Sequence, residues 1–293
     1  MNRLMTIWFA VMMLLALPFS CTAEEIAYTP VKQVDAPGIS VTVESMTLEG
    51  TECFLCRITM DDPGTQIRKV SAPWKESLLL PSDMASEVPD GVLAINGSGY
   101  VSPVFPWIPE NYPGDNPDYY YTPLGSLTIT DGEIFRNLDG VPYFGLTLQQ
   151  DGLHIHAGED NQQVLAASPS QTWSFYVECP FLLDGQSVLD PDWKFTNTPA
   201  MRTIIAKTGD KSYAVLTVTS KGGGLTMAQC TDYLLTHIKP QWAYNLDGGP
   251  SSALMIKGED GQWQTLWGNR SKDMDVMVFA HLEDTYLVTD DEE

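Results

Sequence analysis

Apolar and polar residues alternate in short runs along most of this chain, and clusters of Gly, Pro, Asp and Asn separate the runs. Alternation with a period of two is typical of strands that bury one face. The expected strands are residues 39–46, 53–60, 91–95, 126–130, 143–149, 153–157, 172–177 and 213–219. The pattern therefore predicts a strand-rich protein.

One segment has the period of a helix instead. Apolar side chains recur at helical spacing over residues 226–238, Thr226 is suited to cap the start, and Pro240 follows the end. A second, weaker helix is expected near residues 82–88. Few helices among many strands, with no linker between them, predict an α+β fold. We expect strand-rich mixed sheets, one clear amphipathic helix and a single domain.

Asp-Gly dipeptides occur seven times in the chain. Between apolar runs, Asp-Gly is the strongest short-range signal for a hairpin turn, so plain hairpins are expected over residues 127–134 and 256–263. The segment Asn245–Leu254 (NLDGGPSSAL) differs, because a second glycine, a proline and two serines lengthen the turn. Adjacent glycines allow a sharp bend or a close approach to a ligand. The segment is therefore either a strand-end binding loop or an extended turn.

The first residues have the pattern of an export signal, with a short positive start, an apolar stretch and small residues before the cleavage point. We divide the chain into a signal peptide (1–23), an N-terminal strand-rich segment (24–89), a core of the same domain (90–285) and an acidic tail (286–293). This division predicts a secreted or extracytoplasmic protein of bacterial type. Lipid attachment at Cys21 is the alternative to cleavage after Ala23.

The chain is strongly acidic, with 38 Asp and Glu against 16 Lys and Arg and a formal net charge of −22. This charge excludes nucleic acid and anionic membrane surfaces as partners, because both would repel the protein. After the signal, no apolar stretch is long enough to cross a bilayer. We therefore expect no integral membrane segment in the mature chain.

Cysteine and histidine give little sign of a metal site. Cys53 and Cys56 lie three residues apart in an extended run and so point to opposite faces, which argues against a redox or zinc pair. Free buried thiols and disulfides both stay open. His154 and His156 share one strand face and are expected to be a partly exposed pair. Carboxylate-rich loops can take calcium, so a structural calcium is left open, and no other cofactor is expected.

Residues 100–122 are rich in proline and aromatic residues. Long loops of this kind are usually functional or disordered, and the aromatic content argues against disorder. The rings either stack on sugars or pack the loop onto the body of the protein.

Six short motifs occur in order along the chain. They are Asn96-Gly97, Pro123-Leu-Gly125, Leu182-Leu-Asp-Gly185, Arg202-Thr203, Gly224-Leu-Thr-Met227 and Asn245 to Ser252. Together they resemble the phosphodiester glycosidase family over roughly residues 90–280, and the last motif is the most specific. Two positions depart from the family pattern: Ser98 and Ala206 occupy positions where the family has glycine.

The resemblance implies a hydrolase that cleaves the glycosidic bond of a sugar-1-phosphodiester. A phosphate monoester departs without much help from a general acid. The enzyme therefore needs a cation for the phosphate, donors for the sugar and a carboxylate at the anomeric carbon. Arg202 suits the phosphate because its planar fork matches phosphate oxygens. Asp247 is the first candidate carboxylate and Asn96 a candidate donor, which completes the predicted catalytic set.

A second set of residues is predicted to bind substrate. It comprises Gly97, Thr203, Gly248, Gly249, Ser251, Ser252, Glu178 and Asp184. The glycines would let backbone amides approach the ligand, and the serines would donate to phosphate or cap a turn. Glu178 and Asp184 are second candidate carboxylates, with a strand-end charge and a hairpin turn as their structural alternatives.

The predicted function is an exported hydrolase that acts on a GlcNAc-phosphodiester-like linkage of an extracellular or cell-envelope glycan. One alternative is a non-catalytic, glycan-binding or envelope-binding protein of the same fold. The other is a metal-dependent phosphodiesterase, which the presence of only four histidines disfavours. The identity of any bound metal stays unknown.

Overall fold

The computed structural model describes residues 26–74, 76–101 and 122–282. The predicted export signal, residues 102–121 of the aromatic loop and the acidic tail lie outside the described residues. Within the described part, strands dominate and helices are few and short, which confirms the strand-rich class. None of the helices there is long and apolar enough to span a membrane.

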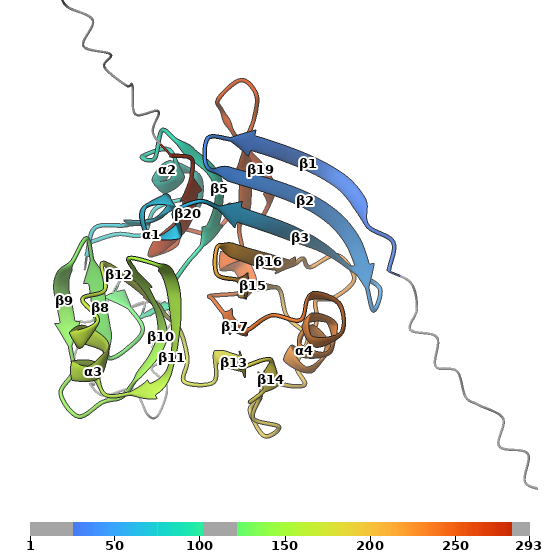
Figure 1. Cartoon of the computed structure of the whole chain (residues 1–293). Coiled ribbons are helices and arrows are strands. Elements are labelled where there is room, and N and C mark those ends of the chain that lie inside the picture. The colour runs from blue at the N-terminus through green and yellow to red at the C-terminus, as the bar shows by residue number, and fades with distance from the viewer. Residues whose placement is uncertain (1–25, 75, 102–121, 283–293) are drawn as a thin grey trace, which may run out of the picture.

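The largest sheet joins segments that are far apart in the sequence. Its strands, in spatial order, are β1 (Thr29–Ala36), β2 (Ile39–Leu48), β3 (Thr51–Met60), β16 (Ser212–Val218), β15 (Arg202–Gly209), β17 (Trp242–Asn245), β13 (Pro180–Leu183) and β14 (Gln186–Ser187). The pairing of β3 with β16 runs from Cys53–Val218 to Thr59–Ser212. N-terminal and C-terminal strands therefore share one sheet (Figure 1).

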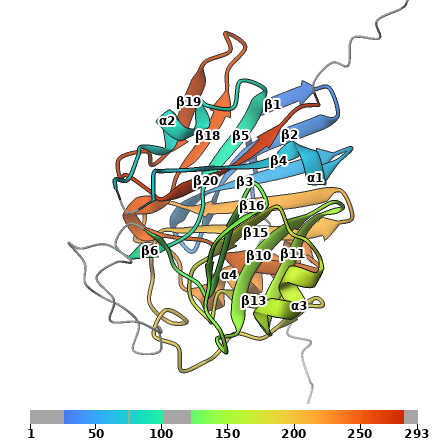
Figure 2. The ribbon, with the colours of Figure 1, turned by 90° about the vertical axis from the view of Figure 1, so that its left-hand side faces the viewer.

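A second sheet of five strands packs against the first. Its strands, in spatial order, are β19 (Trp263–Trp267), β18 (Leu254–Lys257), β5 (Gly91–Asn96), β20 (Asp275–Ala280) and β4 (Ile67–Ser71). The main hydrophobic cluster takes residues from both sheets, including Val41, Ile58, Leu93, Ile256 and Phe279. The core therefore lies between two stacked sheets, both of which are in view in Figure 2.

Helices cover the outer faces of the two sheets. Helix α4 (Met227–Tyr233), which the π-helix Leu234–Ile238 continues, packs on the large sheet, and α2 (Pro81–Ala85) packs on the five-stranded sheet. The central strands β5, β16 and β20 are therefore buried on both faces, whereas the edge strands β1, β14 and β19 are exposed or half-buried. The alternation at Cys53 and Cys56 fits this arrangement, because Cys56 faces the core between the sheets and Cys53 faces the α4 side.

The remaining elements, apart from the short blue helix at residues 63–66, lie mostly to one side of the two sheets, in green in Figure 1. They are α1 (Pro63–Gln66), β6 (Tyr100–Val101) with β7 (Thr122–Pro123), β8 (Leu127–Thr130) with β9 (Glu133–Asn137), α3 (Asn161–Ala166), and the three-stranded sheet β11 (Gly152–Glu159), β10 (Tyr143–Gln149) and β12 (Gln171–Ser174). β8 and β9 form the expected hairpin, with Asp131 and Gly132 both at positive φ.

Local expectations are mostly confirmed and two are corrected. The Thr226 hydroxyl accepts from the Gln229 amide in a capping box, so the helix begins where predicted. The weaker helix is shorter than expected and starts earlier, because Pro81 supplies its first turn. The expected mixed sheets are wrong. Every strand pairing between the described residues is antiparallel, since hairpins and long returns connect the strands.

Candidate active site

The loop from Asn245 to Leu254 crosses between the two large sheets. β17 ends at Asn245 in the eight-stranded sheet, and β18 begins at Leu254 in the five-stranded sheet. Between them lies a single 3-10 turn (Gly249–Ser251), and Gly249 has a φ of 60°, which glycine adopts without strain. This is a strand-end loop and not a hairpin turn.

Asn96 holds this loop in place. It ends β5 with its side chain fully buried, and its amide nitrogen donates to the Asp247 carbonyl at 2.7 Å. Its amide oxygen accepts from the Thr203 hydroxyl at 2.6 Å and from the Ala253 amide at 3.0 Å. The side chain therefore ties β5, β15 and the loop together. In this structure Asn96 and Thr203 position Asp247 from inside the protein instead of facing a cavity.

A cavity of about 620 Å³ opens beside the loop, and we call it the Asp247 cavity. Its aromatic lining is Tyr100, Phe175, Tyr176, Trp193 and Phe195, and its polar side chains are Arg202, Asn245, Asp247, Ser251 and Ser271. Gly248 and Gly249 also line it. Aromatic walls around a few convergent polar groups are typical of sites for small organic ligands.

Arg202 lines this cavity as a buried cation, and it forms no ion pair within the part of the chain that the structure describes. Its residue is only 4% exposed, and its guanidinium donates to three backbone carbonyls, those of Phe195, Thr198 and Leu225, at 2.9–3.0 Å. These bonds use Nε and Nη2, and no protein partner for Nη1 occurs among the described residues. Burial lowers the pKa of Arg202. A buried positive charge with only carbonyl partners favours the binding of an anion.

Asp247 lies in the same cavity but forms no ion pair with Arg202 in the described part of the chain. One carboxylate oxygen accepts from the Gly248 amide at 2.7 Å. Burial raises the pKa of Asp247 to about 7, while the Gly248 amide and the Ser251 hydroxyl lower it and Asp275 raises it. The carboxyl can therefore change its protonation near neutral pH, as a catalytic acid, base or nucleophile requires.

Two further aspartates adjoin Asp247, and the sequence interpretation missed both. Asp273 is 1% exposed, and neither carboxylate oxygen has a hydrogen-bond partner of good geometry within the described residues. Burial, Asp247 and Asp275 all hold the pKa of Asp273 well above its usual range, against the effect of the Ser251 hydroxyl. The available signal was two carboxylates separated by one residue, Asp273 and Asp275, at the start of the apolar strand β20.

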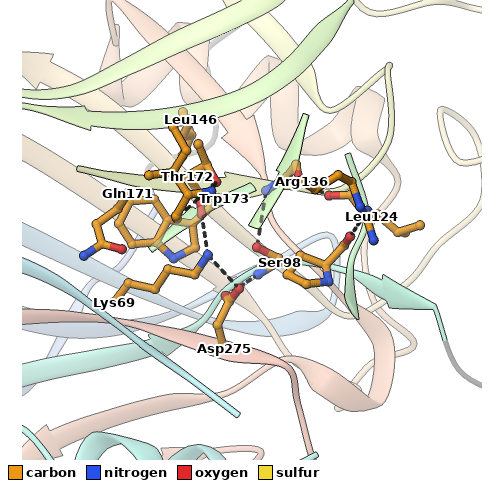
Figure 3. Close-up of polar contacts among 12 residues, drawn as sticks. Lys69, Ser98, Leu124, Arg136, Leu146, Gln171, Thr172, Trp173 and Asp275 are labelled. Carbon is orange, nitrogen blue, oxygen red and sulfur yellow. Dashed lines mark hydrogen bonds and ion pairs between the residues drawn. The ribbon is translucent and has the colours of Figure 1, made fainter. Parts of the chain in front are cut away.

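Asp275, unlike Asp273, has firm partners (Figure 3). One oxygen accepts from the Ser98 amide at 2.7 Å, and the other lies 3.4 Å from Lys69 Nζ. Both charged side chains are fully buried, and Lys69 also donates to the Thr172 carbonyl at 2.7 Å. The ion pair joins β4 to β20, and the hydrogen bond of Lys69 joins β4 to β12.

The glycines of the two site motifs allow close backbone contacts. A side chain at Gly97 would collide with the Asp275 carboxylate, and the Gly97 carbonyl accepts from the Asp247 amide at 3.0 Å. At Gly248 a side chain would press on the Met201 carbonyl. Gly97 therefore serves packing behind the loop, whereas Gly248 and Gly249 face the cavity.

The other predicted residues lie in different settings. Ser251 lines the Asp247 cavity, and Ser252 lines a neighbouring one. Glu178 is half-buried and does not line the Asp247 cavity, and burial raises its pKa. Asp184 is exposed at positive φ in the turn between β13 and β14, so it occupies a hairpin turn. Neither carboxylate lines the Asp247 cavity.

The four cysteines of the described chain are free and buried. Burial raises the pKa of Cys53, Cys179 and Cys230 to about 12, which keeps these thiols protonated and inert. His154 bonds to Asp151 at 2.7 Å. No group of three metal-binding side chains occurs among the described residues. The calcium ion stays a prediction.

Comparisons with known proteins identify the family of this chain. The sequence profile of the phosphodiester glycosidase family matches residues 90–278, and the chain belongs to this family. The fold is similar to the catalytic domain of zebrafish N-acetylglucosamine-1-phosphodiester alpha-N-acetylglucosaminidase, auto-inhibited by its pro-peptide. The TM-score is 0.61 at 16% identity, over 88% of each chain.

A hypothetical protein from Synechocystis is also similar, with a TM-score of 0.52 at 13% identity over 87% of this chain and 68% of that one. At these identities the structural likeness shows the fold alone. A search of curated protein sequences finds no match to this chain.

Proposed function

We propose that this protein is an exported hydrolase that cleaves the glycosidic bond of a sugar-1-phosphodiester on an extracellular or cell-envelope glycan. Family membership supports the reaction class. The observation that carries the proposal is Arg202, a buried guanidinium that forms no ion pair with any described residue, in the cavity that also holds Asp247. An uncompensated cation beside a carboxylate of raised pKa suits a substrate that presents an anion next to an electrophilic carbon.

In this proposal Arg202 binds the phosphodiester. Its Nε and Nη2 groups are fixed by backbone carbonyls, so the guanidinium is already oriented and loses little freedom on binding. Nη1, which has no hydrogen-bond partner among the described residues, would donate to a phosphate oxygen. As the C1–O bond breaks, negative charge grows on the departing phosphate monoester, and the guanidinium stabilises it.

Asp247 acts at the sugar carbon. Its ionised carboxylate stabilises the developing oxocarbenium ion, either by attack on C1 or by activation of water. Water supplies the hydroxyl of the released sugar, and the phosphate monoester leaves with the C1 oxygen. The aromatic walls, among them Tyr176 and Trp193, supply faces for the sugar ring.

Heavy-oxygen water tests the reaction directly. The protein is incubated with UDP-GlcNAc and with a GlcNAc-1-phosphodiester, with and without chelator, and the products are analysed by mass spectrometry. We expect the label in the free sugar and turnover that chelator leaves unchanged.

Label in the phosphate would instead identify a phosphodiesterase. Tight binding of these ligands without turnover would identify a glycan-binding member of the family, and either result would refute the proposal.

A further inference from the structure

A second cavity of about 600 Å³ adjoins the Asp247 cavity, and we call it the Trp267 cavity. Its lining includes Ser220, Lys221, Ser252, Leu266, Trp267 and Arg270. Met201, Pro250 and Ser271 line both cavities, so these side chains form a shared wall. A ligand too long for the first cavity would reach the second across this wall.

The charge of the Trp267 cavity is opposite to that of the chain. Two cations, Lys221 and Arg270, line it with no carboxylate, in a protein with 38 acidic and 16 basic residues. Lys221 Nζ lies 2.8 Å from a carboxylate oxygen of Glu52, which does not line the cavity. The same nitrogen lies 6.0 Å from the centre of the Trp267 ring. Arg270 has no ion pair within the described residues. A guanidinium and an ammonium group in one cavity with an indole ring suit an anionic group attached to a sugar or polyol ring.

The loop that carries Arg270 is held in position from two sides. Gly268 has a φ of 73°, and a side chain there would collide with the Ser252 carbonyl, so the loop backbone packs directly on the Asp247 loop. On the other side, the Asn269 side chain accepts from the Ser82 amide at 3.0 Å. Such a fixed loop loses little conformational freedom when a ligand binds.

We propose that the Trp267 cavity binds the part of the substrate that continues beyond the scissile phosphodiester. Arg270 and Lys221 hold a further anionic group of that chain, and Trp267 supports its sugar or polyol ring. The inference rests on the proposed function and narrows its substrate class to a polyanionic glycan or polyol-phosphate chain. A nucleotide sugar would fill the Asp247 cavity without needing these two cations.

The test measures a short and a long substrate with two double variants, a test variant and a control. The short substrate is methyl GlcNAc-1-phosphate, and the long one is an oligomer of GlcNAc joined by 1-phosphodiesters. The test variant is Arg270→Gln with Lys221→Gln. The control is Lys32→Gln with Lys211→Gln, which removes the same charge from residues that line neither cavity.

We expect the test variant to raise KM for the oligomer about tenfold with little change in kcat, and to leave the short substrate unaffected. The control should behave like the wild type with both substrates. Equal effects on both substrates, or no effect on the oligomer, would overturn the inference.

Direct binding of the oligomer, measured by calorimetry at low temperature, separates this inference from the proposed function. Wild-type binding that the test variant loses, in the absence of any turnover, would uphold the subsite and refute the hydrolase. Turnover with unchanged oligomer affinity would do the reverse. No binding and no turnover would refute both.

Discussion

Two cation–carboxylate sets lie close together in this molecule and differ in one respect. Lys69 and Asp275 face each other at 3.4 Å with both side chains fully buried. Arg202 and Asp247 share a cavity without forming an ion pair. In the first set each charge compensates the other, whereas in the second the arginine has only carbonyl partners and the carboxyl has a raised pKa.

The difference separates structure from chemistry. In a closed, buried ion pair each charge is already neutralised, so no charge is left for a ligand to bind. Removing one partner leaves the other charge buried and uncompensated, which destabilises the fold. An open pair keeps an uncompensated cation and a titratable carboxyl available to substrate. In the proposed function, Lys69 and Asp275 therefore have a structural role, and Arg202 and Asp247 have the catalytic roles.

The largest effect is expected from Asp247→Asn. Asparagine can still accept the Gly248 amide, so the fold should be kept, whereas kcat/KM for a GlcNAc-1-phosphodiester should fall about 1000-fold. Steady-state kinetics with the circular dichroism spectrum as a control checks this. Activity within a few-fold of the wild type would remove Asp247 from the mechanism.

The same variant tests the pKa of Asp247 through stability. Because burial raises the folded-state pKa to about 7, the carboxyl favours the folded state while it is protonated. This contribution is fully present below the unfolded-state pKa of about 4 and is lost as the pH rises through about 7. The thermal unfolding temperature of the wild type should therefore fall across this pH range by more than that of Asp247→Asn.

Lys69→Met should destabilise the fold by about 3 kcal/mol, because it leaves the Asp275 carboxylate buried without its partner. Denaturant unfolding measures this change. The double variant Lys69→Met with Asp275→Asn should recover most of the loss, since it removes the stranded charge. If Lys69→Met abolished catalysis without any loss of stability, the assignment of this pair to structure would be wrong.

Arg202→Lys keeps the positive charge but loses the planar fork. We expect kcat/KM to fall about 100-fold, with the free energy of unfolding changed less than in Lys69→Met. Kinetics and denaturant unfolding are measured on the same preparation. A variant that loses stability and keeps activity would place Arg202 with the closed pair.

The smallest effect concerns the pH profile. If Asp247 acts ionised, kcat/KM should rise as the pH passes through about 7. The Ser251 hydroxyl lowers the pKa of Asp247, so Ser251→Ala should raise that pKa and move the rising limb to higher pH by less than about one unit. A limb that stays in place or moves down would contradict the role given to this hydroxyl.

Local pattern predicted the elements well where burial on one face set the period. Strand β10 has the predicted bounds, Tyr143–Gln149, and the Thr226 cap was visible because capping depends on near neighbours. The antiparallel sheets were not predicted, because strand order depends on contacts between distant segments such as β3 and β16.

The site was predictable only in part, for the same reason. The loop around Asp247 was predictable because it has its own sequence signature. Arg202 was predicted from its motif and lines the same cavity as Asp247. Lys69 and Asp275 were missed because the pairing of β20 with β4 and β5 carries them to the site, and Asp273 is held there by its bridge to Leu79. The internal contacts of Asn96 with Thr203 and Ala253 also span more than a hundred residues.

Substrate binding to the Asp247→Asn variant is the most direct test of the roles given to Arg202 and Asp247. Calorimetric titration of a GlcNAc-1-phosphodiester into Asp247→Asn should give a measurable Kd without turnover. Adding Arg202→Lys to this background should weaken binding at least about tenfold, whereas a denaturant series should show both proteins folded. Equal affinity in the two proteins would show that Arg202 does not bind the phosphate, and would contradict the account of the site.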